Sequence, residues 1–283
     1  MYWKWTKRGF FSEFNLFLYA YYIAKKNNET LFLDVTESNL GSGRLTEYFP
    51  YFHEYTDLRI AEAASDPKDV FGVDRAVFDK RAERSFKRLW NQGLNHKIDD
   101  TSLSELARQL FKVDAISTLE PLSSCIPKNP FIGIHVRRGD KLINEADYIP
   151  VSSYLDEVKR QSGQAIFVST DDQSVIEELN NDTISIHWNK NNFGNGHNQN
   201  EFNNLVDEGK TRAIQVLLAD VFVLLKSDYF VGDYASNIAR FVAIYRGHKN
   251  VKSIGKSFTH YYDPGRQSTL YRFYKYMAQF YEK

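Results

Sequence analysis

The segment 131–145, which reads FIGIHVRRGDKLINE, brings two arginines, an aspartate, a lysine and a glutamate close together in the chain. Arginine side chains present planar forks of donors that suit phosphate oxygens. The neighbouring guanidinium groups of Arg137 and Arg138 repel each other unless an anion compensates them. A diphosphate would supply that negative charge, although carboxylates such as that of Asp140 could also do so. The segment therefore indicates either an anion site or a solvated strand end.

A short strand should position these charged side chains. Ile132, Ile134 and Val136 alternate with other residue types, which is the period of a β-strand. We expect the strand to end at Arg138 and Gly139, because glycine permits a turn that other residues resist. Ligands bind at the carboxyl ends of the strands in open α/β sheets. The pattern therefore places the charged residues at a ligand-binding edge.

Strand-like and helix-like segments alternate along most of the chain. The N-terminal residues predict a helix from Gly9 to Lys26 and then a strand at 30–35. Residues 73–90 predict an amphipathic helix, and Ser102 with Glu105 predicts a capped helix start. Further strands are expected at 165–169, 183–188, 229–232 and 251–254, separated by helices at 151–161, 172–179, 208–226 and 236–246. This alternation predicts parallel sheets covered by helices. The asparagine-rich residues 189–204 should form a mobile loop near the site.

Three motifs in order resemble those of the α1,6-fucosyltransferase family and its nodulation-fucosyltransferase relatives. The first is the run 135–141, followed by Glu145. The second is the Ser-Thr-Asp-Asp sequence at 169–172, and the third extends from Leu218 to Arg240. The resemblance covers roughly residues 131–247, and three motifs in the same order are much more specific than any single one.

The resemblance implies an α/β fold of the GT-B type, in which two Rossmann-like domains face a cleft and a C-terminal helix returns to the first domain. Pro121, Pro127 and Pro130 exclude a continuous helix, and we place the domain boundary near them. The predicted units are an acceptor-side domain at 1–125, a nucleotide-sugar-binding domain at 126–262 and a crossover helix at 263–283.

The resemblance also implies an inverting, metal-independent glycosyltransferase that uses GDP-fucose as the donor and a glycan as the acceptor, with no further cofactor. It assigns Glu145 as the base that deprotonates the acceptor hydroxyl, with Lys141 nearby, and Arg137 and Arg138 are expected to stabilise the departing diphosphate. The donor-binding residues that it implies are His135, Arg137, Arg138, Asp140, Asp171, Asp172, Asp220, Ser236 and Asn237.

The residues alone leave several of these roles open. Asp171 and Asp172 could bind a metal, cap a helix or contact base and ribose, but the arginine pair makes a cation redundant for phosphate charge, so we expect no metal. Asp220 interrupts an apolar helical run, so its carboxylate requires donors from the protein or from the N1–H and N2–H groups of guanine. Ser236 could be a simple helix cap or a phosphate contact.

The composition excludes several classes of protein. The 36 basic residues equal the 36 acidic residues, so no global field would attract nucleic acid. The single cysteine, Cys125, favours a reducing compartment. The apolar stretch 16–24 is shorter than the roughly 20 residues of a membrane span, and no cleavage site of a signal peptide follows it. We therefore expect a soluble cytoplasmic protein without an integral membrane segment.

Two alternative functions remain at this stage. The first keeps the fold and the chemistry but uses another nucleotide sugar, for example a UDP-pentose such as UDP-xylose, because a fold does not fix the donor. The second is a protein that binds a nucleotide or a glycan without turnover. The presence of both Lys141 and Glu145 argues against the second alternative.

Overall fold

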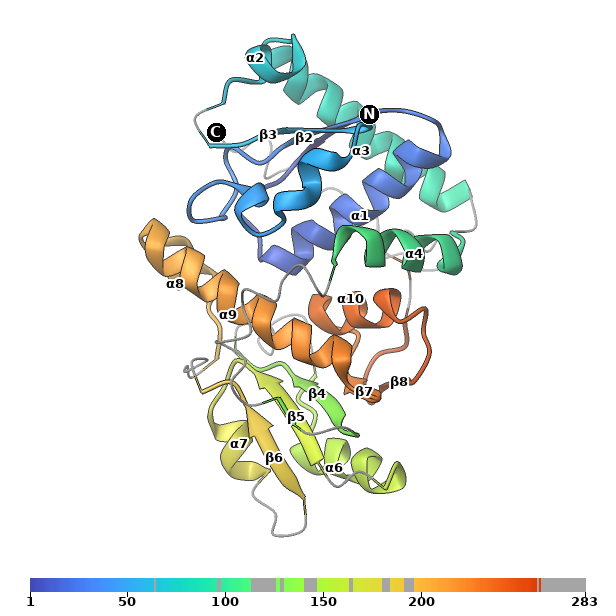
Figure 1. Cartoon of the computed structure of the whole chain (residues 1–283), viewed down its shortest axis with the longest axis vertical. Coiled ribbons are helices and arrows are strands. Elements are labelled where there is room, and N and C mark those ends of the chain that lie inside the picture. Colours follow the sequence, from blue (N-terminus) through green and yellow to red (C-terminus); the bar gives the residue numbers. More distant parts are fainter. Residues whose placement is uncertain are drawn as a thin grey trace.

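The structure is a computed structural model that describes residues 1–63, 65–95, 98–112, 126–127, 130–139, 147–162, 165–179, 184–190, 196–258 and 260. It is an α/β protein with two parallel sheets (Figure 1). The first sheet has the order β1 (Tyr2–Lys4), β2 (Leu31–Asp34), β3 (Leu58–Ala61). The second sheet has the order β6 (Ser185–Trp188), β5 (Ala165–Thr170), β4 (Ile132–Val136), β7 (Tyr229–Gly232), β8 (Val251–Ser253).

Helices surround both sheets. The N-terminal unit consists of the first sheet with α1 (Phe10–Lys26), α2 (Pro67–Phe71), α3 (Arg75–Asn95), α4 (Asp100–Leu110) and the 3₁₀ turns η1 (Leu45–Glu47) and η2 (Pro50–Glu54). The C-terminal unit consists of the second sheet with α6 (Val151–Arg160), α7 (Ser174–Glu178), α8 (Gln199–Asn203), α9 (Asp207–Lys226) and α10 (Asn237–Tyr245). Helices α9 and α10 lie between the two sheets (Figure 1).

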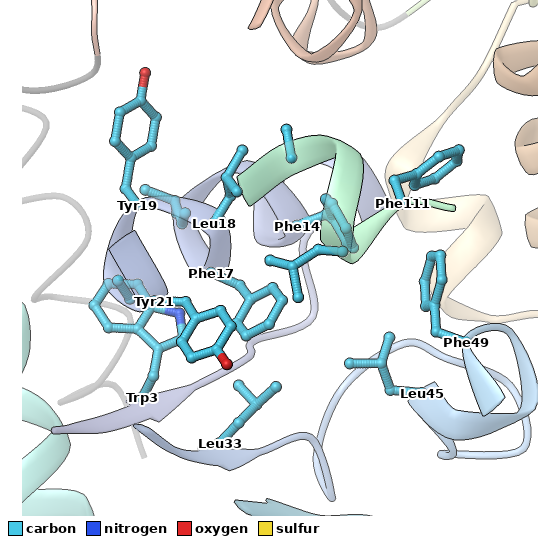
Figure 2. Close-up of a cluster of buried hydrophobic side chains, with 14 of the residues drawn as sticks. Trp3, Phe14, Phe17, Leu18, Tyr19, Tyr21, Leu33, Leu45, Phe49 and Phe111 are labelled. Atoms are coloured by element: carbon cyan, nitrogen blue, oxygen red, sulfur yellow. The ribbon is translucent and has the colours of Figure 1, made fainter. Parts of the chain in front are cut away.

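Helix α1 is the centre of the largest apolar core. Its residues from Phe14 to Ala24 are all buried, and a helix that is apolar on most sides is typical of a protein interior. Figure 2 shows Phe14 and Phe17 among aromatic side chains from other elements, including Phe49 and Phe111. The Phe14 ring also lies 5.4 Å from that of Phe241 on α10. The two units therefore share one core, which fixes the sheets relative to each other.

The predicted alternation of strands and helices is confirmed, and β7 has the predicted bounds. Some details differ. β4 ends at Val136 rather than at Arg138 and Gly139, and Gly139 forms the expected turn with φ 64°. The capping-box prediction is wrong, because Asp99 caps α4 by accepting from the backbone N–H groups of Thr101 and Ser102 at 3.2 and 3.3 Å. Most residues around the predicted domain boundary, and all residues of the predicted crossover helix, lie outside the described part of the chain, so both stay predictions.

The segment 189–204 is not a simple loop, because it contains α8. Asn198 caps this helix: its Oδ1 atom accepts from the backbone N–H groups of Asn200 at 2.9 Å and Glu201 at 3.3 Å. Among the asparagines that indicate a loop, Asn198 is a helix cap, and Asn200 and Asn203 lie in α8. No helix in the described part of the chain combines the length and the apolar character that crossing a membrane requires.

Candidate active site

Four strands of the second sheet end at one edge, and a polar residue follows each of them. Arg137 follows β4, Asp171 follows β5, Asn189 follows β6 and Asp233 follows β7. All of these strands are parallel, so their carboxyl ends meet at the same edge. The sequence places Arg137 and Asp171 in different motifs, and the structure brings them onto neighbouring strands. This is the edge where open α/β sheets bind ligands.

Asp171 is the acceptor around which this edge is organised. Its Oδ2 atom forms an ion pair with the guanidinium of Arg137 and accepts from the His197 backbone N–H at 2.9 Å. Its Oδ1 atom accepts from the Arg138 backbone N–H at 2.7 Å. The Asp171 carbonyl accepts from the Gly196 N–H at 2.9 Å. Asp171 therefore joins the loop after β4 to the segment that leads into α8.

Gly139 lets this segment come close to the loop after β4. A Cβ atom at Gly139 would lie 2.5 Å from the His197 carbonyl oxygen and 2.6 Å from the His197 nitrogen. Its φ of 64° also lies in the left-handed region that favours glycine. Only a residue without a side chain fits here, so the predicted turn also serves a close contact between two site loops.

The two neighbouring arginines have different surroundings. Arg138 is only 4% exposed, its Nη2 atom donates to the Ile149 carbonyl at 3.0 Å, and its Cζ atom lies 4.3 Å from the centre of the Tyr148 ring. The side chain of Arg137 is 17% exposed and pairs with Asp171. The protein thus compensates both charges internally, by a carboxylate and by a cation–π contact. Arg137 is the arginine better placed to exchange its partner for a ligand.

A pocket opens beside these arginines at the ends of β4 and β7. Within it, His135 Nε2 and Ser236 Oγ lie 2.9 Å apart, and both residues are buried. Ser236 also caps α10, since its Oγ accepts from the Ile238 backbone N–H at 3.3 Å. The positive end of a helix thus borders the pocket, which favours an anion there. The pocket is lined by His135, Arg137, Arg138, Asp147, Ile149, Tyr154, Asp233, Ala235 and Ser236.

Two polar residues of this pocket, Tyr154 and Asp233, were not predicted as site residues, and a third, Asp147, is the alternative base if Glu145 does not serve as one. Asp233 directly follows β7, so its position at a strand end is a signal that could have identified it. Its Oδ1 atom accepts from the backbone N–H groups of Ala235 at 3.1 Å and Lys256 at 2.8 Å. Burial raises the pKa of Tyr154, so its phenol stays protonated at neutral pH and can donate a hydrogen bond.

A second pocket lies at the ends of β5 and β6. Asp220 on α9 is 1% exposed, and its Oδ1 atom accepts from Asn189 Nδ2 at 3.0 Å. The protein itself therefore supplies one of the donors that this buried carboxylate requires. Trp188, the last residue of β6, contributes an aromatic surface. A carboxylate beside an aromatic ring suits a planar heterocycle that carries N–H donors. The lining residues are Val168, Thr170, Gln173, Ile176, Trp188, Asn189 and Asp220.

Two further predicted donor-binding residues have contacts outside these pockets. Asp172 Oδ1 accepts from the Ser174 backbone N–H at 2.9 Å just before α7, although the N-cap position of that helix is Gln173. The Asn237 carbonyl accepts from Asn15 Nδ2 at 2.9 Å and so joins α10 to α1. Three predicted site residues lie outside the described part of the chain and stay predictions: Asp140, Lys141 and Glu145.

Helix α8 joins the site edge to the N-terminal unit. Asn39 Nδ2 donates to Asn203 Oδ1 at 2.6 Å and to the Lys7 carbonyl at 2.7 Å. Gln199 Nε2 donates to Asn203 Oδ1 at 2.8 Å. The residues just before α8 are those that hydrogen-bond to Asp171. One short segment therefore contacts both the site and the other unit.

Two parallel sheets with helices between them are the architecture of the GT-B type. Residues 112–246 match the family model of the alpha-(1,6)-fucosyltransferase N- and catalytic domains. The predicted resemblance to this fucosyltransferase family is therefore confirmed. A comparison with curated proteins gives no significant match.

Solved structures support the same fold. The fucosyltransferase NodZ from Bradyrhizobium has a TM-score of 0.52 and 13% sequence identity, over 94% of this chain and 96% of that chain. NodZ alpha-1,6-fucosyltransferase co-crystallised with GDP has a TM-score of 0.51 and 13% identity, over 85% of this chain and 91% of that chain. The chain thus has the GT-B fold of these fucosyltransferases.

Proposed function

We propose that this protein is an inverting, metal-independent fucosyltransferase that transfers fucose from GDP-fucose to a hydroxyl group of a glycan. The observation that carries the proposal is the presence of two complementary pockets at one sheet edge. The first has an arginine and a helix N-terminus, which suit a diphosphate, and the second has Asp220 beside Trp188, which suits guanine. The structurally similar NodZ has been co-crystallised with GDP, which supports the same nucleotide here.

In this mechanism the diphosphate lies in the first pocket. Its oxygens replace Asp171 as the partner of Arg137, and the Ser236 hydroxyl and the N-terminus of α10 supply further positive potential. The bond between the anomeric carbon and the phosphate oxygen breaks as the acceptor oxygen attacks from the opposite face. Negative charge then grows on the diphosphate, so the contact with Arg137 strengthens in the transition state. The bond electrons leave with GDP.

The acceptor hydroxyl must lose its proton during this attack. The family resemblance assigns Glu145 to that role, with Lys141 nearby, and a positioned base contributes about 10²–10⁴ in rate. The contacts of the adjacent aspartates support a reaction without a metal, because Asp171 pairs with Arg137 and Asp172 accepts from the Ser174 backbone N–H. Arginine and the helix N-terminus then provide the electrostatic stabilisation that a cation provides in other transferases.

GDP should raise the melting temperature of the protein more than UDP does. The Asp220 carboxylate can accept from two donors of guanine, whereas uracil does not present that pair of donors. A ligand that binds only the native state stabilises it by about 2.7 kcal/mol at 100 times its Kd, so thermal denaturation can measure the difference. In Asp220→Asn the difference between the two shifts should shrink. Equal or larger shifts with UDP would favour a UDP-sugar donor instead.

Transfer activity should survive EDTA, because Arg137 and α10 rather than a cation stabilise the diphosphate. A transfer assay in the presence and absence of the chelator, with later addition of manganese, measures this directly. The Kd of GDP, measured in the presence of EDTA, serves as the control for nucleotide binding. Loss of activity that manganese restores would make Asp171 and Asp172 metal ligands and would contradict the role given to Arg137.

A further inference from the structure

We propose that Tyr148 is a stacking platform for a sugar ring of the acceptor glycan, at the rim of the pocket that would hold the diphosphate. The proposal rests on the proposed transferase function and specifies how its second substrate is held. Tyr148 was not predicted as a site residue.

Tyr148 is unusual in its exposure. It is the one aromatic residue among the exposed large apolar residues of the described chain, which are Val70, Val77, Tyr148, Leu205 and Val206. It is 59% exposed, whereas the tyrosines of the N-terminal core are buried or partly buried. A single exposed apolar residue is normal on a protein surface, so exposure alone does not indicate a site.

The position of Tyr148 beside the first pocket provides the second observation. Its two neighbours in the chain, Asp147 and Ile149, both line that pocket. The Tyr148 ring covers the guanidinium of Arg138, which lines the same pocket, with the Cζ atom 4.3 Å from the ring centre. Arg138 is itself held by a hydrogen bond to the Ile149 carbonyl at 3.0 Å. The ring is therefore fixed at the rim of the pocket on one face and open to solvent elsewhere.

A fixed and exposed aromatic ring suits a sugar. Pyranose rings present one face that consists largely of C–H groups, which carry a small positive charge, and these groups pack on the electron-rich face of an aromatic ring. The Asp147 carboxylate beside the ring is exposed and can accept hydrogen bonds from sugar hydroxyls. Because Arg138 already fixes the ring, little conformational entropy is lost when the sugar binds.

The geometry of transfer requires an acceptor at this place. The sugar of the donor is attached to the terminal phosphate, so its anomeric carbon lies at the mouth of the diphosphate pocket. The acceptor hydroxyl must reach that carbon within about 3–3.5 Å. A glycan whose ring stacks on Tyr148 is held at the rim of the same pocket. The competing interpretation is that Tyr148 only positions Arg138, and the two interpretations predict different effects of substitution.

The test measures glycan binding and nucleotide binding separately. Cellotetraose, chitotetraose and maltotetraose are titrated into the protein with and without saturating GDP, and binding is followed by saturation-transfer NMR and calorimetry. In Tyr148→Ala the Kd of the oligosaccharide that binds should rise about tenfold, which corresponds to the loss of one stacked ring. In Tyr148→Phe it should stay within about threefold of the wild type, because the ring remains. Val77→Ala on α3 removes an exposed apolar side chain elsewhere and should change nothing.

The outcomes separate the two interpretations. If Tyr148 is a stacking platform, the Kd of GDP in Tyr148→Ala should stay within about threefold of the wild type, while the affinity for the glycan falls. An unchanged glycan Kd in this variant, or the absence of binding by all three oligosaccharides, would show that the platform does not exist. A rise in the Kd of GDP alone would mean that Tyr148 acts only through Arg138. Failure of the wild type to bind GDP would instead contradict the proposed function, and the titration without GDP would still test the platform.

Discussion

Replacing Arg137 with alanine should raise the Kd of GDP about ten- to a hundredfold and should reduce sugar transfer by at least that factor. A hydrogen bond to a charged group contributes about 1.5–3 kcal/mol, and each 1.4 kcal/mol is about tenfold in affinity. The contact exists before bond breaking and tightens as charge develops on the diphosphate, so binding and turnover should fall together. Calorimetric titration of GDP and a radiolabelled-sugar transfer assay measure the two effects.

The matched control is Arg160→Ala on α6. The side chain of Arg160 is 65% exposed and pairs with Glu157 at 2.7 Å, so this variant also removes one arginine from an ion pair, but outside both pockets. It should bind and transfer normally. In Arg137→Ala, Asp171 keeps its hydrogen bonds from the backbone N–H groups of Arg138 and His197, so the variant should fold. Normal GDP affinity in Arg137→Ala would mean that Arg137 only partners Asp171.

Replacing Glu145 with glutamine should leave GDP affinity nearly unchanged and reduce turnover by about 10²–10⁴. Glutamine keeps the size and much of the hydrogen bonding of glutamate but cannot accept the proton of the acceptor hydroxyl. The same two assays apply. The combination of intact binding and lost turnover is what distinguishes a general base from a binding residue.

Asp147→Asn is the informative companion variant, because Asp147 is a carboxylate two residues away that lines the pocket proposed for the diphosphate. If Glu145→Gln transfers sugar normally while Asp147→Asn loses turnover, then Asp147 is the base and Glu145 is an ion-pair partner of Lys141. A wild-type protein that binds GDP and glycans but never transfers sugar would support the alternative of a binding protein without turnover.

The fold could be predicted from the sequence wherever a pattern was long enough. The apolar run 229–232 between polar segments gives β7 its correct bounds. Strands β1 and β3 were not predicted, because Lys4 and Arg59 interrupt their short apolar runs. Asp99 and Ser102 are both common capping residues, and the two positions between them do not decide which one begins the helix. In the structure Asp99 is the cap, and Ser102 lies within the first turn of α4.

The candidate site could be predicted only in its residue types and its strand ends. The pairing of Arg137 with Asp171 joins residues from different motifs, and no local pattern can show such a contact. The same is true of Tyr148 on Arg138, because an exposed tyrosine has no sequence signature. The sequence indicated that the positive charges of two adjacent arginines require compensation. It could not indicate that the protein itself provides part of this compensation.

Asp171 also has a thermodynamic consequence, because it shares its oxygens between Arg137, the proposed phosphate contact, and the segment that begins α8. A phosphate that takes Arg137 away from Asp171 changes the hydrogen bonds that hold this segment, and α8 in turn contacts the N-terminal unit through Asn39. Nucleotide affinity and the strength of the contact between the units are then linked quantities. Such a linkage is reciprocal, so whatever loosens α8 from Asn39 also changes the affinity for the nucleotide, at a distance from the pocket and by the same free energy.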